Sequence, residues 1–154
     1  QEGKIRHLGA SSVLPNLADH LATGVFDAFQ IPYSALERQH ETWITKAARA
    51  GIGTIIRGGV AKGEPGEGQG REERWAKFAE AGLDELREEG EGRTAFMLRF
   101  TLSHPDMHTT IVGTQKPEHL RENLKAAMAG PLPADVYDEA KRRLAAAGVA
   151  PEAG

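Results

Sequence analysis

The sequence predicts an α/β protein with four parallel strands, each followed by a helix. Short apolar segments alternate with longer amphipathic ones along the 154 residues, and this alternation is typical of βα units whose strands run parallel. Proline or glycine stands at the ends of most segments, where these residues begin or end helices and strands. Four βα units make either a small open sheet with helices on both sides or one half of an eight-stranded barrel, because a complete barrel takes about 250 residues.

Each element has its own signal in the sequence. Short, β-branched or aromatic-rich runs predict strands over residues 4–10, 25–31, 53–56 and 109–112. Helical spacing of apolar residues predicts helices over residues 15–21, 41–50, 72–89, 94–103, 117–129 and 134–147. Pro32 is expected to end the second strand, Gly51 to cap the second helix, and Pro117 to take the first position of the fifth. Two of the predicted helices are therefore additional to the four βα units: one lies before the fourth strand and the other at the end of the chain.

A glycine-rich segment over residues 58–70 separates the third strand from the next helix. It contains the run EPGEG at 64–68 and little that can be buried. Because such a segment cannot offset its ordering entropy by burial, we expect a long mobile loop. Apart from this loop, we expect residues 1–154 to form a single domain.

Composition excludes several classes of protein. With 40% apolar and 27% charged residues and a net charge of −3, the chain has neither the basic excess of a nucleic-acid binder nor an apolar run long enough for a membrane helix. The absence of cysteine rules out disulfides and thiolate metal sites. We therefore expect a cytoplasmic protein without nucleic-acid, membrane or metal partners. A chain that begins with Gln is also expected to be an excised or processed piece.

The common motifs of nucleotide and metal sites are missing. Gly51-Ile52-Gly53 precedes a strand instead of following one, which excludes a dinucleotide fingerprint. His104 and His108 are four residues apart, but a proline lies between them, so they are interpreted as turn histidines rather than zinc ligands. What remains is a set of small and polar residues after each predicted strand, at the sheet edge where α/β proteins bind ligands. Every βα turn needs such residues, so this placement alone does not establish a site.

Six segments in conserved order resemble the aldo-keto reductases. They are GKIRHLGASS at 3–12, FQIPYS at 29–34, GIG at 51–53, LSHP at 102–105, IVGT at 111–114 and PEHLRENL at 117–124. The resemblance covers nearly the whole chain but only the C-terminal half of that family, strands five to eight of its TIM barrel. It implies four βα units forming half of a (β/α)₈ barrel.

The resemblance also implies a function. The family reduces aldehydes and ketones by hydride transfer from NADPH, without a metal, through an Asp, Tyr, Lys and His tetrad that lies on its N-terminal half. No residue of this chain therefore takes a catalytic role by resemblance. The implied activity is that of half an NADP-dependent oxidoreductase, which carries the cofactor side and is inactive alone. NADP(H) binding is expected to be weak or lost in the isolated half.

The implied cofactor contacts fall in four groups. Ser11, Ser12 and Gln30 match the groups that hold the nicotinamide amide, although the second serine is usually Asn. The implied pyrophosphate loop begins with Arg57, Gly58 and Gly59. The position of the adenosine 2′-phosphate is matched by Gly113, Thr114, Gln115 and His119, with Lys116 as the nearby cation. Adenine contacts are implied for Glu122 and Asn123.

Half a barrel leaves its first and last strands without neighbours, and exposed strand edges promote association. We therefore expect either a homodimer or a complex with a missing N-terminal half. The alternative functions are a self-standing half-barrel that binds nucleotide without chemistry, and a purely structural half-barrel in which the site residues have no role.

Overall fold

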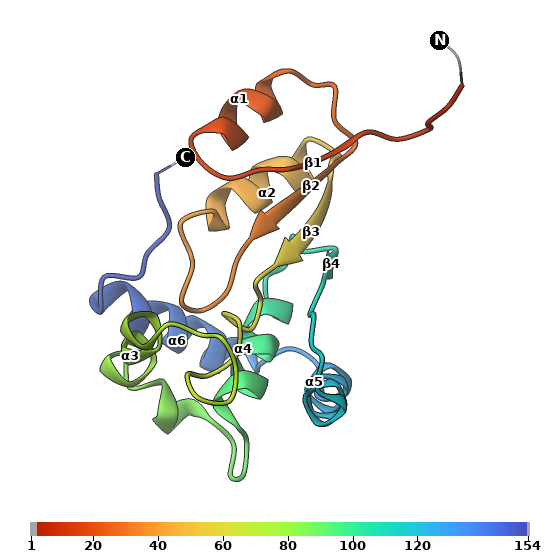
Figure 1. Ribbon diagram of the computed structural model, residues 1–154. Coiled ribbons are helices and arrows are strands. Elements are labelled where there is room, and N and C mark those ends of the chain that lie inside the picture. Colours follow the sequence, from red (N-terminus) through yellow and green to blue (C-terminus); the bar gives the residue numbers. More distant parts are fainter. Residues whose placement is uncertain (1–2, 154) are drawn as a thin grey trace.

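The computed structural model describes residues 3–153 and confirms the predicted order of elements (Figure 1). The strands are β1 (Gly9–Ser11), β2 (Ala28–Pro32), β3 (Gly53–Arg57) and β4 (Thr109–Thr110). The helices are α1 (Asn16–Ala22), α2 (Glu41–Arg49), α3 (Glu72–Glu80), α4 (Arg93–Leu102), α5 (Pro117–Ala129) and α6 (Ala134–Ala146), with a 3₁₀ turn η1 (Leu83–Leu86) after α3. All strand pairs are parallel, and the sheet order β1-β2-β3-β4 follows the chain.

The two faces of this sheet differ in burial. Phe29, Ile31 and Ile56 point to one face and are fully buried in the core. Their alternate neighbours, such as Gln30 and Ile55, are only half-buried on the opposite face. Parallel sheets are normally covered on both faces. A parallel sheet with one open face is what half of a barrel presents, since the inner face of a complete barrel is covered by its opposite strands.

Side chains from five helices pack on the covered face. Leu17 of α1 and Ile44 of α2 lie behind the first strands, and Phe96 and Phe100 of α4 extend the core toward α3 and α6. The ring of Phe100 meets that of Tyr137 in α6 at a centroid distance of 4.9 Å. The core therefore includes both additional helical segments as well as the βα units.

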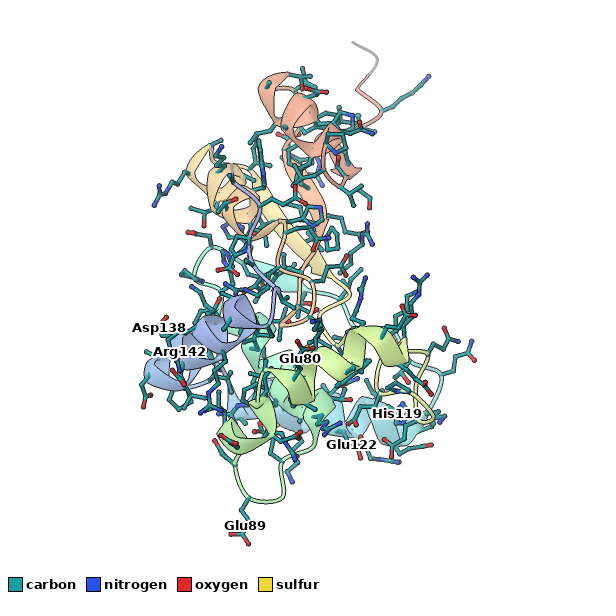
Figure 2. All side chains as sticks on the ribbon, turned by 90° about the vertical axis from the view of Figure 1, so that its left-hand side faces the viewer. Glu80, Glu89, His119, Glu122, Asp138 and Arg142 are labelled. Atoms are coloured by element: carbon teal, nitrogen blue, oxygen red, sulfur yellow. The ribbon has the colours of Figure 1, made fainter. Side chains whose placement is uncertain are left out.

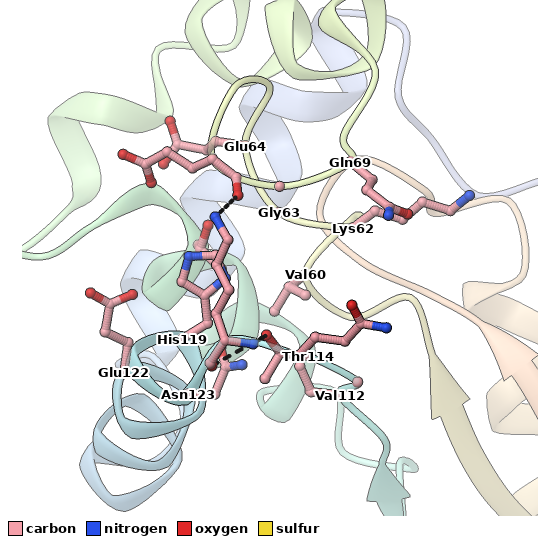
Figure 3. Close-up of a pocket in the computed structure, with 16 residues that line it drawn as sticks. Val60, Lys62, Gly63, Glu64, Gln69, Val112, Thr114, His119, Glu122 and Asn123 are labelled. Carbon is pink, nitrogen blue, oxygen red and sulfur yellow. Dashed lines mark hydrogen bonds between the residues drawn. The ribbon is translucent and has the colours of Figure 1, made fainter.

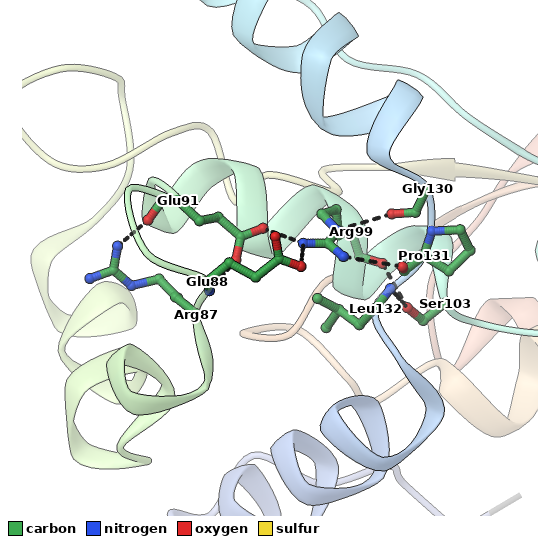
Figure 4. A network of polar contacts seen from close by, with 8 residues as sticks. All are labelled: Arg87, Glu88, Glu91, Arg99, Ser103, Gly130, Pro131 and Leu132. Carbon is green, nitrogen blue, oxygen red and sulfur yellow. Dashed lines mark hydrogen bonds and ion pairs between the residues drawn. The ribbon is translucent and has the colours of Figure 1, made fainter.

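Arg99 of α4 connects that helix to the chain on either side of it (Figure 4). Its Nη1 lies 2.8 Å from Glu88 Oε1 and 2.9 Å from Glu91 Oε1, and its Nε donates to the carbonyl of Gly130 at 3.1 Å. In the same place the Leu132 N–H donates to Ser103 Oγ. These bonds fix the turn between α5 and α6 against the end of α4, and they thereby position α5.

Predicted helix ends are confirmed where glycine or proline sets the backbone. Gly51 follows α2 with a φ of 76°, a left-handed conformation that costs glycine little, and its N–H donates to the Ala48 carbonyl. Pro117 is the first residue of α5.

Several predicted boundaries were wrong. The first strand was predicted over 4–10, but its register with β2 begins only at Gly9, because the chain before Leu8 extends away from the sheet in Figure 1. The fourth was predicted over 109–112 and is two residues long. The second runs through Pro32 instead of stopping before it, because the N–H of Tyr33, and not of the proline, donates to the Arg57 carbonyl.

The helix predicted over 72–89 was also too long. It ends at Glu80, because Gly82 adopts a φ of 62° and starts the tighter turn η1. Charged residues in 83–89 continue the helical period in the sequence, but the backbone does not follow it. The remaining helices match their predicted spans to within about two residues.

The glycine-rich loop 58–70 is folded back on itself. Its N–H groups at Gly63, Gly68 and Gln69 donate to the carbonyls of Val60, Glu64 and Lys62, at 2.8, 2.7 and 2.9 Å. Ala61 is buried in the core. The loop thus has a defined path across the end of the sheet, and its mobility stays a prediction.

Candidate functional site

A pocket of about 730 Å³ lies between the glycine-rich loop and the start of α5 (Figure 3). One wall is formed by loop residues between Val60 and Gln69, and the other by residues 112–116 together with His119, Glu122 and Asn123. Figure 2 shows His119 and Glu122 beside the loop, away from Asp138 and Arg142 of α6. The volume of the pocket falls within the roughly 300–1,000 Å³ that is typical of small-molecule sites.

The wall on the α5 side is built by a tight turn after β4. The N–H of Lys116 donates to Thr114 Oγ1 at 3.1 Å, and Pro117 then begins the helix. Within residues 3–153 no side chain caps this helix, so the N–H groups of its first turn remain available at the pocket. A helix N-terminus favours negatively charged groups.

One hydrogen bond joins the two walls. Lys116 Nζ donates to the carbonyl oxygen of Glu67 at 2.9 Å (Figure 3). Because the acceptor is a neutral carbonyl, the ammonium keeps its charge for a ligand. Lys116 therefore holds the loop over α5 and places a cation at the helix N-terminus.

The pocket carries charges of both signs. Lys62 and Lys116 are its cations, and Glu64, Glu67 and Glu122 are its carboxylates. Burial raises the pKa of Glu64, and the guanidinium of Arg93, 3.9 Å away, opposes this increase. Such a lining suits a ligand with several hydrogen-bonding groups and an anionic group near Lys116.

Six of the predicted site residues line this pocket. They are Gly113, Thr114, Gln115, His119, Glu122 and Asn123. All six come from one continuous segment, which the family resemblance singled out without knowledge of long-range contacts. No individual residue of the facing wall, between Val60 and Gln69, was predicted to line a site. The only signal for this wall was the predicted long loop at 58–70.

The other six predicted residues lie outside the pocket. Ser11 and Gln30 are register partners in β1 and β2 on the open face of the sheet. Ser12 is 5% exposed, and its hydroxyl lies 3.0 Å from His20 Nδ1. The hydroxyl is thus already paired within the protein. A role of these three side chains in cofactor binding stays a prediction.

The start of the predicted pyrophosphate loop is partly occupied in packing. Thr101 Oγ1 donates to the Gly59 carbonyl at 2.9 Å, and a Cβ on Gly59 would stand 3.0 Å from Thr101 Cγ2. A side chain at this position would therefore press against Thr101 of α4. Gly58 is exposed with a φ of 72°, and Arg57 Nε is buried without a hydrogen-bond partner among the described residues.

The histidines near β4 are structural. His104 is 4% exposed, its Nε2 lies 3.2 Å from the Glu41 carbonyl, and its Nδ1 accepts the Asp106 N–H. Burial lowers the pKa of His104, with smaller opposing effects from Glu41 and Asp106. His108 Nδ1 accepts the Thr54 N–H at 3.0 Å. Residues 3–153 contain no cluster of His, Asp or Glu side chains that would hold a metal ion.

A second, smaller pocket of about 150 Å³ lies on the helical side, lined among others by Glu41, Tyr137 and Lys141. Its carboxylate is already paired: Lys141 Nζ lies 3.3 Å from Glu41 Oε1, and Arg38, beside the pocket, donates from Nε to Glu41 Oε2 at 2.7 Å. Burial alone would raise the pKa of Glu41, but Arg38 and Lys141 lower it. This pocket therefore belongs to the packing of α6. None of the helices in the described residues is of the length and apolar character that crossing a membrane requires.

The sequence matches the model of the aldo/keto reductase family over residues 1–144. A curated relative, the uncharacterised oxidoreductase YqkF of Bacillus subtilis, is 27% identical over 84% of this chain and 47% of its own length. The chain thus spans about half the length of that relative.

Solved structures of this family also match the chain over about half of their own length. The aldo-keto reductase AKR11C1 from Bacillus halodurans, in its holo form, superposes with a TM-score of 0.74 at 25% identity, over 93% of this chain and 51% of that one. The glycerol dehydrogenase AKR11B4 from Gluconobacter oxydans shares the fold, with a TM-score of 0.72 at 21% identity, over 99% and 53% of the two chains. Four parallel strands and six helices correspond to about half of these structures.

Proposed function

Because the chain belongs to the aldo/keto reductase family, we propose that it is the cofactor-binding half of an NADP(H)-dependent oxidoreductase. The observation that carries this proposal is the pocket between the glycine-rich loop and α5, which gathers six residues implied as adenosine contacts. The holo and apo forms of AKR11C1 support the presence of a bound cofactor in the family.

The residues of the pocket fit the adenosine end of such a cofactor. The amide of Asn123 and the carboxylate of Glu122 offer both donors and acceptors for an adenine edge. Lys116 and the uncapped N-terminus of α5 would hold the 2′-phosphate, with Thr114 and His119 beside them. Bound NADPH supplies a hydride to a carbonyl compound.

The nicotinamide end has fewer partners. Ser11 and Gln30 lie on the open face of the sheet, where their side chains would hold an amide by hydrogen bonds. Ser12 first has to release His20 to contribute its hydroxyl. Affinity is therefore expected to come mainly from the adenosine end, and it should be weak.

We further propose that the chain alone does not turn over substrate. By family resemblance the catalytic tetrad is expected on the other half of the barrel, and the chain spans about half the length of its relatives. Hydride transfer also requires exclusion of water from the reacting atoms, whereas one face of this sheet is open.

Titration of the chain with NADPH, followed by the fluorescence of the reduced nicotinamide and by calorimetry, tests the proposal. Lys116→Ala should weaken binding by about ten- to a hundredfold, since one charge-assisted hydrogen bond contributes about 1.5–3 kcal/mol. Lys125→Ala is the matched control, because Lys125 lies on the exposed surface of the same helix and outside the pocket. Absence of NADPH binding, or equal binding by both variants, would contradict the assignment of this pocket.

A further inference from the structure

Two carboxylates stand on the part of the glycine-rich loop that faces α5. Glu64 and Glu67 both line the pocket, and Figure 3 shows Glu64 across from His119 and Asn123. Lys116 Nζ donates to the backbone carbonyl of Glu67 itself. The two acids and the ammonium therefore share one end of the pocket, so that a ligand group which reaches Lys116 also comes close to the carboxylates.

The turn that carries these acids has a defined backbone. The Gly68 N–H donates to the Glu64 carbonyl at 2.7 Å, and Gly66 between them adopts a φ of 87°, which favours glycine. The Gln69 N–H then donates to the Lys62 carbonyl at 2.9 Å and closes the turn on the start of the loop. Local hydrogen bonds thus fix where the two acids stand relative to α5.

The negative charge of Glu64 is only partly compensated. Arg93 Nη1 lies 3.9 Å from Glu64 Oε2, but the same guanidinium makes two shorter bonds to Asp84, at 2.8 and 2.6 Å. Burial raises the pKa of Glu64, Arg93 opposes this increase, and the neighbouring Glu67 adds to it. Negative charge therefore accumulates on the loop wall, where it disfavours a further anion.

We propose that Glu64 and Glu67 set the cofactor preference of this pocket, and that they make it accept NADH about as well as NADPH. The inference rests on the proposed function and concerns one position of the ligand, the 2′-oxygen of the adenosine ribose. This oxygen carries a phosphate in NADPH and a hydrogen in NADH. All other groups of the two cofactors are the same.

The ribose of NADH suits the loop wall. Its 2′- and 3′-hydroxyls are neighbouring hydrogen-bond donors, and an ionised carboxylate accepts a bond on each of its two oxygens. In other nucleotide sites an acidic side chain beside the ribose binds the 2′-hydroxyl of NAD, whereas a basic one accommodates the phosphate of NADP. Glu64 and Glu67 offer two such carboxylates at the pocket.

The 2′-phosphate of NADPH meets opposing charges instead. Lys116 and the first turn of α5 attract it. The carboxylates of Glu64 and Glu67 repel it from the facing wall, because a phosphate monoester carries about two negative charges at neutral pH. Lys62, the other cation of the lining, lies away from His119 in Figure 3. Attraction and repulsion at this end of the pocket offset one another, and little preference for NADPH remains.

Calorimetric titrations with NADPH and with NADH in the same buffer test this inference. The two dissociation constants of the chain should agree within about tenfold. Glu67→Gln should tighten NADPH binding by about three- to tenfold, because it removes one charge near the phosphate. It should not tighten NADH binding, since the amide oxygen replaces the carboxylate as an acceptor. Glu64→Gln should shift the preference in the same direction by a smaller factor, because Arg93 already offsets part of that charge.

Glu89→Gln is the matched control and should change neither constant. Figure 2 shows Glu89 at the tip of a different loop, far from His119 and Glu122. Adenosine 2′,5′-bisphosphate and AMP repeat the comparison with ligands that fill only the adenosine end of the site. Their dissociation constants should also agree within about tenfold, and Glu67→Gln should tighten the bisphosphate alone.

Two results would overturn the inference. One is a preference of the unmodified chain for NADPH of more than about tenfold. The other is equal tightening of both cofactors by Glu67→Gln, because the carboxylate would then act on the pyrophosphate that the cofactors share. Binding of neither cofactor would instead overturn the proposed function itself, so the two failures are distinguishable.

Discussion

Arg99 Nη1 lies 2.9 Å from Glu91 Oε1, and both side chains are less than one-tenth exposed. The same Nη1 also reaches Glu88, whose side chain is 68% exposed. One guanidinium therefore makes a buried and an exposed ion pair at once. Removal of one partner of a buried pair costs far more than removal of an exposed one, since it leaves a charge without solvent or counterion.

Arg99→Met should lower the free energy of unfolding by about 3 kcal/mol. The change leaves the buried Glu91 carboxylate and the Gly130 carbonyl without their bonds to the guanidinium. Urea denaturation followed by circular dichroism measures this. Glu88→Gln is the control and should cost less than about 1 kcal/mol. Similar losses in the two variants would contradict the distinction.

Thr54→Val should lower the free energy of unfolding by about 1–3 kcal/mol. Thr54 is fully buried, its hydroxyl donates to the Asp106 carbonyl at 2.8 Å, and it accepts the His108 N–H at 3.0 Å. Valine keeps the shape but leaves both backbone groups unpaired. Thr109→Val, at an exposed position of β4, should change stability by less than about 0.5 kcal/mol. Equal effects in urea denaturation would argue against this anchor of β4.

Stability should fall as the pH decreases from 7 toward 5. Burial lowers the pKa of His104 and of His40 in the folded protein, so the unfolded chain takes up protons at a higher pH than the folded one. The free energy of unfolding is then lost as pH falls through the unfolded pKa of about 6.5. Urea denaturation across this range should give a shallower pH dependence for His104→Gln. A slope in His104→Gln equal to that of the wild type would count against this origin.

Gly68→Ala should weaken NADPH binding. A Cβ there would stand 2.5 Å from the Lys62 carbonyl oxygen and 2.8 Å from Gly63 Cα, so the loop has to move away from the wall that Lys116 holds. Gly92→Ala, with open space around its Cβ, is the control. Calorimetric titration distinguishes the two, and full affinity in the Gly68 variant would show that the loop wall does not contact the nucleotide.

The purified chain should show no NADPH-dependent reduction of common aldehydes. A steady decrease of absorbance at the NADPH band with substrate would measure any turnover. A clear rate that disappears with Gln30→Ala would overturn the assignment of this chain as an inactive half, because it would place the chemistry at its own strand ends.

The elements that sequence patterns located best are those set by local chemistry. Gly51 and Pro117 mark helix ends through their own backbone preferences, and Phe29 and Ile31 signal a buried strand by apolarity alone. Sequence patterns did not predict the ends of elements that depend on contacts with distant segments or on a single backbone conformation. Residues 4–8 look like a strand but lie beyond the ladder, and Gly82 ends a helix whose charge pattern continues.

The candidate site divides in the same way. The wall from Gly113 to Asn123 is one continuous segment, so its motif was visible in the sequence. The opposing wall reaches the pocket through a bond from Lys116 to Glu67, 49 residues away, and no local pattern encodes that pairing. Nor does any pattern reveal that Ser12 is already bonded to His20.

The contact of α6 with the core has a consequence for synthesis of the chain. Tyr33 Oη lies 2.8 Å from Tyr137 Oη, and Arg38 Nη1 donates to the Lys141 carbonyl at 2.9 Å, across more than one hundred intervening residues. Each βα unit can dock on its predecessor as it leaves the ribosome, because strands adjacent in sequence are adjacent in the sheet. Tyr33 and Arg38, in contrast, can form these hydrogen bonds only after α6 has been synthesised, several seconds later. During that interval the nascent protein exposes an aromatic and a charged group that the finished fold buries, which makes this surface a natural place for a chaperone to act.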